Sequence, residues 1–177
     1  MKIFICPGMH SPELTDSFIE NLGLSRDRLL ILPPHIPPYS GIEILDFLNC
    51  NCDRTASLLC IAFSAGVVGT IFAASVWQGQ GGTVSALIAL DGWGVPLVGD
   101  FTIYRLSHDY FTHWSSALLG AGEESFYADP GVEHLELWRS PRTIRGWRNA
   151  RHDKIRCSAA EFLWDLLQRY DLFSQNK

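Results

Sequence analysis

The sequence predicts an α/β protein, a three-layer α/β/α sandwich around a mostly parallel sheet of about six strands. Short β-rich apolar runs alternate along the chain with stretches of helical periodicity, which is the pattern of a parallel α/β sheet. Two of the runs, residues 57–63 and 84–90, are apolar almost throughout, as expected for strands covered on both faces. The 177 residues contain no repeat or linker, so we expect a single domain over residues 1–177.

The first half of the chain alternates between expected strands and helices. Residues 3–6 form the first expected strand, which ends at Pro7 and Gly8. A second strand, residues 29–32, leads into residues 33–41, where four prolines fix φ and remove backbone donors, so this segment is expected to be a loop. The third strand is residues 57–63, and the expected helices are residues 13–22, 41–49 and 66–77.

The second half continues the alternation with a weaker strand signal. Residues 84–90 and 101–106 are expected strands, and residues 124–128 form a weak one. Residues 112–119 look helical. The strongest helix is residues 159–170, because its apolar side chains form one stripe. That stripe consists of Phe162, Leu163, Leu166, Leu167 and Tyr170.

Composition excludes several classes of protein. Hydrophobic residues make up 47 % and charged residues 19 %, which excludes intrinsic disorder. No run approaches the ~20 apolar residues of a membrane span, and the apolar run in residues 1–6 is too short for a secretory signal, so we expect a cytoplasmic protein. We expect its cysteines to be reduced thiols, because their number is odd and most have apolar neighbours. They are Cys6, Cys50, Cys52, Cys60 and Cys157.

Charge is distributed unevenly along the chain. The net charge of −5 argues against general nucleic-acid binding, but residues 139–156 carry seven of the fourteen Lys and Arg and one acid. Arg139, Arg142, Arg145, Arg148, Arg151 and Lys154 recur at every third position. One interpretation is a solvated ribbon that balances the acidic remainder. The other is a docking patch for an anionic acyl carrier, coenzyme A ester, lipid headgroup or partner protein.

One turn has the pattern of a nucleophile elbow. Residues 62–66, Ala-Phe-Ser-Ala-Gly, join an apolar strand to a small-residue helix. Such a turn holds its serine at positive φ, so that Oγ projects above the sheet, and it needs small residues two before and two after. Ala62 replaces the usual first glycine and adds one methyl group. The simpler alternative is that Ser64 merely caps a helix.

The order of motifs resembles the α/β-hydrolase superfamily, and within it the small, lidless, single-domain serine hydrolases. Besides the turn at Ser64, residues 103–114 look like the family's strand, turn and acid. Residues 131–141 resemble its histidine segment, where a proline follows seven residues after the histidine. The resemblance covers most of the chain and implies a compact fold without the family's first two strands and lid. It also implies a carboxylesterase or thioesterase-like enzyme without cofactor or metal.

The resemblance implies a catalytic triad and its surroundings. Ser64 would be the nucleophile, His134 the general base, and Asp109 the acid that orients His134. Backbone N–H groups of Ala65 and Met9 would form the oxyanion hole. A small-molecule acyl substrate would occupy a pocket with apolar and aromatic lining. The expected pocket residues are His10, Trp93, Tyr110 and Trp114.

Several alternatives remain open from the sequence. Asp91 also follows a strand and is a rival for the acid. The rival histidines are His10, His108, His113 and His152. Cys50 and Cys52 lack a second pair of ligands, so no metal site is expected. A different hypothesis is a hydrolase-shaped binding protein without turnover, since Ala62 and Pro7 depart from the family pattern.

Overall fold

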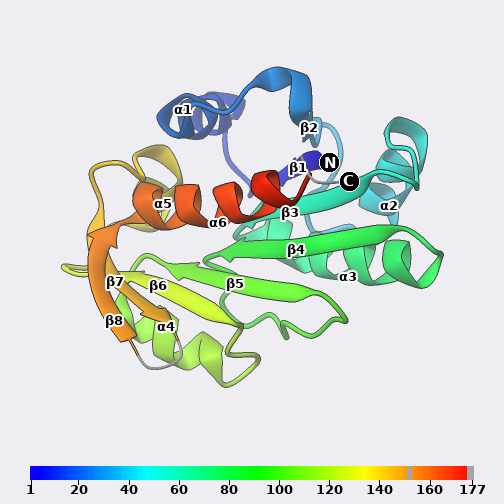
Figure 1. Cartoon of the computed structure of the whole chain (residues 1–177). Coiled ribbons are helices and arrows are strands. Elements are labelled where there is room, and N and C mark those ends of the chain that lie inside the picture. Colours follow the sequence, from blue (N-terminus) through cyan, green and yellow to red (C-terminus); the bar gives the residue numbers. More distant parts are fainter. Residues whose placement is uncertain (151–152, 175–177) are drawn as a thin grey trace.

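An eight-stranded sheet runs through the molecule, with helices on both of its faces (Figure 1). The computed structural model describes residues 1–150 and 153–174. The strand order is β2-β1-β3-β4-β5-β6-β7-β8. The strands are β1 (Lys2–Cys6), β2 (Leu29–Ile31), β3 (Ser57–Phe63), β4 (Thr83–Leu90), β5 (Thr102–Ser107), β6 (Glu124–Ala128), β7 (Arg145–Ala150) and β8 (Asp153–Ser158). The α-helices are α1 (Pro12–Leu22), α2 (Gly41–Asn51), α3 (Ala65–Gly79), α4 (Tyr110–Ala117), α5 (His134–Arg139) and α6 (Ala159–Ser174), and a 3-10 turn covers Arg26–Arg28.

The alternation of side chains along each strand divides the core between two faces. In β3, Leu59 and Ile61 pack on one face, where α1, α5 and α6 cover the sheet. Leu58 and Cys60 point to the other face, which α2 and α3 cover. Figure 1 shows α6 crossing one face while α3 lies on the other. The central strands are therefore apolar on both sides, as the sequence predicted.

The first six strands are parallel, so their carboxyl ends lie along the same edge of the sheet. The loops after β1, β3, β4, β5 and β6 consequently gather at that edge. This edge, at the carboxyl ends of the parallel strands, is where α/β sheets usually bind ligands. The predicted α/β class and mostly parallel sheet are confirmed, and every expected strand and helix is present.

The predicted count of about six strands is wrong, because the basic segment adds two. Strands β7 and β8 pair antiparallel with each other, and β7 pairs antiparallel with β6. They escape sequence analysis because the hairpin lies at the sheet edge, where charged side chains replace the apolar alternation of a buried strand. The short helix α5 is also an addition to the expected elements.

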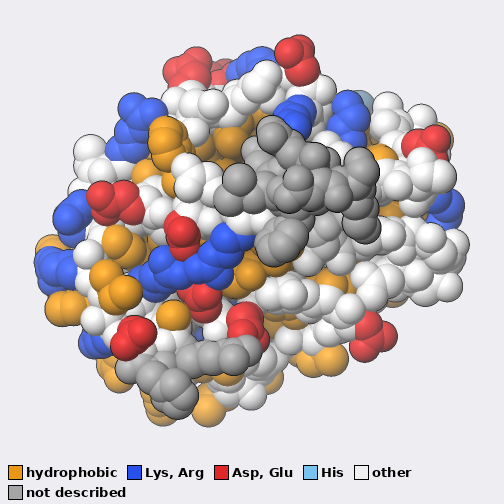
Figure 2. All heavy atoms as spheres, in the orientation of Figure 1, with side chains coloured by type: hydrophobic (Ala, Val, Ile, Leu, Met, Phe, Trp, Pro, Cys, Tyr) orange, Lys and Arg blue, Asp and Glu red, His pale blue; other side chains and the backbone are white. Residues whose placement is uncertain are grey.

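The arginines of the basic segment that the structure describes all contact other groups of the chain. Arg148 lies 2.6 Å from Glu124 and 2.8 Å from Asp165, and Arg145 lies 3.2 Å from Glu161. Since side chains alternate along a strand, a spacing of three places Arg145 and Arg148 on opposite faces of β7. Figure 2 shows basic and acidic side chains interleaved on this side of the molecule. These contacts favour the charge-balancing interpretation over the docking patch; residues 151 and 152 lie outside the described part.

None of the helices in the described ranges is long and apolar enough to cross a membrane.

Candidate active site

Ser64 occupies a strained turn between β3 and α3. Its φ of 52° and ψ of −121° are unusual for a residue with a side chain, and its N–H donates to the Leu90 carbonyl at 2.8 Å. Two residues later, a Cβ on Gly66 would lie 2.5 Å from the Pro7 carbonyl oxygen, so only glycine fits there. Ala62 is fully buried in the sheet core, which accommodates its methyl group. The turn therefore has the strained geometry that the sequence predicted.

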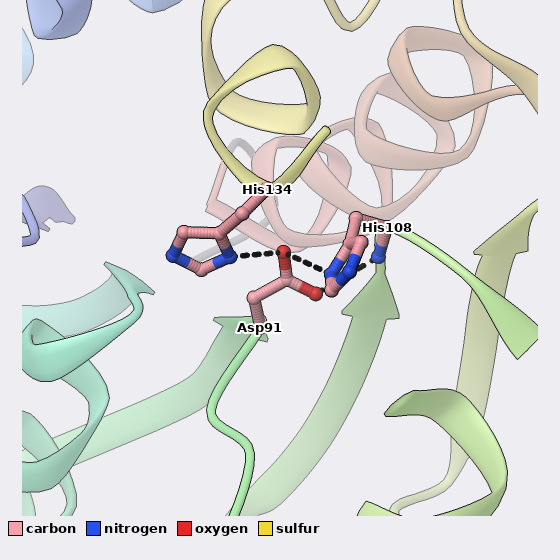
Figure 3. A group of neighbouring side chains, drawn as sticks. All are labelled: Asp91, His108 and His134. Atoms are coloured by element: carbon pink, nitrogen blue, oxygen red, sulfur yellow. Dashed lines mark hydrogen bonds and ion pairs between the residues drawn. The ribbon is translucent and has the colours of Figure 1, made fainter. Parts of the chain in front are cut away.

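Asp91 holds two histidines at the carboxyl edge of the sheet (Figure 3). It follows β4 with a φ of 50°, and its side chain is only 1 % exposed. Its Oδ2 accepts hydrogen bonds from Nδ1 of His134 at 2.8 Å and from Nδ1 of His108 at 3.0 Å. Its Oδ1 accepts from the backbone N–H of His108 at 2.8 Å. Three donors therefore fix and stabilise one buried carboxylate.

The prediction that Asp109 pairs with His134 is wrong. Asp109 is the N-cap of α4, and its Oδ1 accepts from the backbone N–H of Thr112 at 2.7 Å. Burial raises the pKa of Asp109, but the hydrogen bonds from Thr112 and the charge of His108 outweigh it and leave the pKa below its usual value. The acidic partner of His134 is Asp91, the rival identified from the sequence.

His134 is positioned by ring stacking as well as by Asp91. It is the first residue of α5, and its ring stacks on Phe63 with a centroid distance of 4.7 Å. Trp138, one turn further along α5, stacks on the same Phe63 ring at 5.1 Å. Phe63 directly precedes Ser64, so the stack ties the imidazole to the nucleophile turn. Figure 3 shows that the second ring nitrogen of His134, Nε2, points away from Asp91.

Ser64 and His134 border the same cleft, which we call the catalytic cleft. Its volume is about 500 Å³. Its lining is mixed: Asp91, His108 and His134 form a polar group, and Trp93 and Phe111 are aromatic. The lining residues are Ser64, Ala65, Val68, Asp91, Trp93, Val95, His108, Asp109, Phe111, Thr112 and His134.

The structure places only part of the expected pocket in this cleft. Trp93 lines it, as predicted. Tyr110 and Trp114 are not among the residues that line it in the described part of the chain, so their prediction is wrong. They stand four apart on α4 and share one face of the helix, whereas Phe111 and Thr112 face the cleft. Phe111 is an apolar lining residue that the sequence analysis missed.

The loop after β1 lies against the nucleophile turn. A Cβ on Gly8 would lie 3.1 Å from Cβ of Ser64, which places this loop beside the serine. Met9 and His10 follow, and they line a second cavity and not the catalytic cleft. Ala65 begins α3, so its N–H belongs to the first-turn amides that lack an acceptor within the helix. Ala65 therefore directly follows the serine, while the residue of the β1 loop shown beside Ser64 is Gly8, so the oxyanion donors Ala65 and Met9 stay a prediction.

The remaining histidines differ in environment. The hydrogen bond to Asp91 raises the pKa of His108, although burial opposes it. Burial lowers the pKa of His10, and it lowers the pKa of His113 to about 4. Nε2 of His113 lies 3.3 Å from Nδ2 of Asn149, and His113 is not among the described residues that line the catalytic cleft. The rival His152 lies outside the described residues.

The second histidine on Asp91 is the main feature that sequence analysis missed. His108 follows β5 directly, and Asp91 follows β4 directly, so both positions are predictable as neighbours at one sheet edge. In the sequence analysis His108 is treated only as a rival of His134, and its contact with Asp91 is not predicted. The signal that could have predicted this contact is the position of His108 at the end of β5, next to the end of β4, and not its spacing in the sequence from an acidic residue.

Asp91, His108 and His134 could also hold a metal ion. One ligand atom from each lies within 4.8 Å of the others, and two imidazoles with one carboxylate are a known donor set for divalent metals. Hydrogen bonding already accounts for the arrangement, since both Nδ1 atoms donate to one carboxylate oxygen. Cys50 and Cys52 are free thiols.

No family model matches this chain, and no curated protein matches it. The resemblance to the α/β-hydrolase superfamily therefore stays a prediction. The functional argument depends on the geometry of Ser64, Asp91 and His134.

Proposed function

We propose that the protein is a serine hydrolase that cleaves an ester, thioester or related acyl bond through an acyl-enzyme on Ser64. The observation that carries the proposal is the 2.8 Å hydrogen bond from His134 to the buried Asp91 in the cleft that contains Ser64. The chain order of nucleophile, acid and histidine is that of the superfamily it resembles. The hydrolase variant of the α/β fold and a cytoplasmic location belong to the same proposal.

In the first half of the reaction, Oγ of Ser64 attacks the carbonyl carbon while Nε2 of His134 takes its proton. Asp91 keeps the other proton on Nδ1 and stabilises the imidazolium that forms. The backbone N–H groups of Ala65 and Met9 stabilise the oxyanion. The imidazolium then gives its proton to the departing alcohol or thiol, and the acyl group remains on Ser64.

In the second half, His134 takes a proton from water, and the resulting hydroxide equivalent attacks the acyl-enzyme carbonyl. Collapse of the second tetrahedral intermediate releases the carboxylic acid and returns the proton to Oγ of Ser64. His108 acts as a positioning residue, because its two hydrogen bonds fix both oxygens of Asp91. The fixed carboxylate in turn selects the tautomer of His134.

A fluorophosphonate probe tests the proposal, because only an activated serine reacts with it. We expect the wild type to be labelled, Ser64→Ala not to be labelled, and the circular dichroism of the two to agree. Ser75→Ala is the matched control, since Ser75 lies on the same helix and bonds the Ile71 carbonyl instead of a catalytic group. We expect it to be labelled like the wild type.

Labelling of Ser64→Ala, or ester turnover above ~1 % of wild type in that variant, would contradict Ser64 as the nucleophile. Absence of both labelling and ester turnover in the folded wild type would instead support the hypothesis of a binding protein without turnover.

A further inference from the structure

The side chains around Asp91 converge as the ligands of a metal ion do. Among the residues that the structure describes, Asp91, His108 and His134 form a group whose ligand atoms all lie within 4.8 Å of one another. Oδ2 of Asp91 lies 2.8 Å from Nδ1 of His134 and 3.0 Å from Nδ1 of His108. Figure 3 shows both rings turned toward this one carboxylate. The three atoms therefore face a common point at the carboxyl edge of the sheet.

The distances between these atoms are close to those of a zinc site. Zinc binds imidazole nitrogen and carboxylate oxygen at about 2.0–2.2 Å with tetrahedral angles, which places neighbouring ligand atoms about 3.4 Å apart. Each Nδ1 would have to move away from Oδ2 by only about half an ångström to admit the ion. Both rings line the catalytic cleft and are partly exposed, so an ion can enter from solvent.

Asp109 supplies the partner that a metal-bound His108 needs. An imidazole that binds a metal through Nδ1 carries its proton on Nε2 and normally donates it to a carboxylate, a carbonyl or water. Nε2 of His108 lies 3.6 Å from Oδ2 of Asp109, and the bond from the Thr112 N–H to Oδ1 fixes that carboxylate.

His108 thus has a carboxylate at each of its ring nitrogens, Asp91 at Nδ1 and Asp109 at Nε2. A neutral imidazole has one proton and can donate to only one of them. A second positive charge on the ring, either a proton or a metal ion, satisfies both carboxylates. A metal ion at Nδ1 leaves the single ring proton free for Asp109.

The donor set selects the kind of ion. Two imidazoles and one carboxylate suit zinc and similar divalent transition metals, whereas Mg²⁺ and Ca²⁺ prefer sites built from oxygen atoms. The carboxylate of Asp91 binds the ion directly, and that of Asp109 adds a second negative charge close by, which favours a divalent cation.

We propose that Asp91, His108 and His134 bind a zinc ion, and that the bound ion inhibits the enzyme. The inhibition rests on the proposed hydrolase function, whereas the binding does not. Zinc on Nδ1 of His134 leaves the proton of the neutral ring on Nε2, which then cannot take the proton of Ser64. The ion also occupies the carboxylate oxygen that orients the ring. The hydrogen-bonded, active arrangement and the zinc-bound arrangement therefore exclude each other.

Calorimetric titration with zinc chloride tests the binding, after treatment of the protein with EDTA and dialysis. We expect the wild type to bind a zinc ion at this site. In His108→Asn, the amide N–H replaces the Nδ1 donor to Asp91 but the imidazole ligand is lost. Loss of an outer partner alone costs about 10–100-fold in metal affinity, so we expect His108→Asn to weaken binding at least tenfold and Asp109→Asn to weaken it about tenfold.

Two matched controls remove other groups that zinc could use. Cys50→Ser removes an exposed free thiol, and His113→Gln removes a histidine that is not among the described residues lining the catalytic cleft. We expect both variants to bind zinc at the site with the affinity of the wild type, and circular dichroism checks that every variant is folded.

Turnover of a short ester measures the inhibition. We expect the wild type to lose activity in proportion to the fraction of sites filled and to regain it when EDTA is added. Each variant is compared with its own rate without zinc. At the zinc concentration that halves the wild-type rate, a tenfold loss of affinity should leave His108→Asn with about 90 % of its own rate. Should His108→Asn fail to fold, Asp109→Asn provides the same comparison.

Absence of saturable zinc binding in the wild type, or equal affinities in the wild type, His108→Asn and Asp109→Asn, would overturn the metal site. Activation by zinc, or loss of activity in EDTA, would overturn the inhibition. Failure of the hydrolase proposal looks different: the metal-free wild type would neither turn over the ester nor react with the fluorophosphonate probe, while its zinc titration would still depend on His108.

Discussion

Replacing Asp91 by Asn tests the central geometry, because the two residues have the same shape but different hydrogen-bonding groups. The carboxylate accepts three N–H groups, at 2.8, 2.8 and 3.0 Å. Asn offers one acceptor oxygen and one NH₂ donor. The backbone N–H of His108 cannot become an acceptor, whereas an imidazole can change tautomer. The Asn oxygen is therefore expected to stay on that backbone N–H, with its NH₂ facing the two rings.

That orientation reverses the tautomer of His134. Nδ1 must then accept a hydrogen bond, and the ring proton moves to Nε2, where it can no longer take the proton of Ser64. A wrong tautomer costs ~10⁴ in kcat in a triad. We expect Asp91→Asn to lose about four orders of magnitude in turnover and in the rate of fluorophosphonate labelling. The free energy of unfolding should fall by about 1–3 kcal/mol, the cost of an imperfectly paired buried group.

Asp109→Asn is the matched control. Asn caps a helix as well as Asp does, so the bond to the Thr112 N–H is kept. The variant loses only the negative charge of Asp109, whose Oδ2 lies 3.6 Å from Nε2 of His108. This ion pair is weak, so we expect turnover to fall by less than about fivefold. Turnover of a short ester and stopped-flow labelling measure both variants. A loss in Asp109→Asn as large as that in Asp91→Asn would refute the assignment of the acid.

Three further predictions concern stability, and chemical denaturation measures each of them. Gly66→Ala should lower the free energy of unfolding by about 1–3 kcal/mol, because the new Cβ would collide with backbone oxygens. Gly79→Ala is its control: the space around a Cβ at that position is open, so the change should be neutral or stabilising. Burial lowers the pKa of His113 to about 4 in the folded protein, so as pH falls from 6.5 to 4 this histidine binds a proton in the unfolded chain before it does so in the folded one. The free energy of unfolding of the wild type should therefore fall over that pH range relative to that of His113→Gln. Arg148→Gln should lower the free energy of unfolding more than Arg145→Gln does, because the Arg148 side chain is only 18 % exposed and lies between two carboxylates. The exposed ion pair of Arg145 is worth about 0–1 kcal/mol. Equal losses in the two variants would show that burial of the ion pair is irrelevant.

Local signals predicted the nucleophile turn and most of the fold. Ser64 is predictable because the requirements of the turn lie within five consecutive residues: the end of a strand, a serine in a strained conformation, and small residues two before and two after it. The buried strands were predictable because both of their faces are apolar. In each case the physical cause is contained in the segment itself.

The acid was not predictable in the same way. Asp91 and Asp109 each follow a strand that ends at the same sheet edge, and the choice between them depends on backbone direction. The positive φ of Asp91 directs its carboxylate into the cleft, while Asp109 is occupied as the cap of α4. A capping signal was present, since an Asp at the start of a helix satisfies N–H groups of the first turn. The β7–β8 hairpin was missed because its paired residues are charged and exposed.

The two edges of the sheet limit how copies of this chain can associate. At one edge, β2 contributes only three residues, too short a template for an added strand. At the other, β8 presents Asp153, Lys154 and Arg156 to solvent, and a neighbouring chain would have to bring its own backbone against these charges. Growth of the sheet from chain to chain is disfavoured at both ends, which protects a protein with several fully apolar strands against edge-to-edge aggregation. A stable oligomer of this protein would therefore have to pair through its helices or loops.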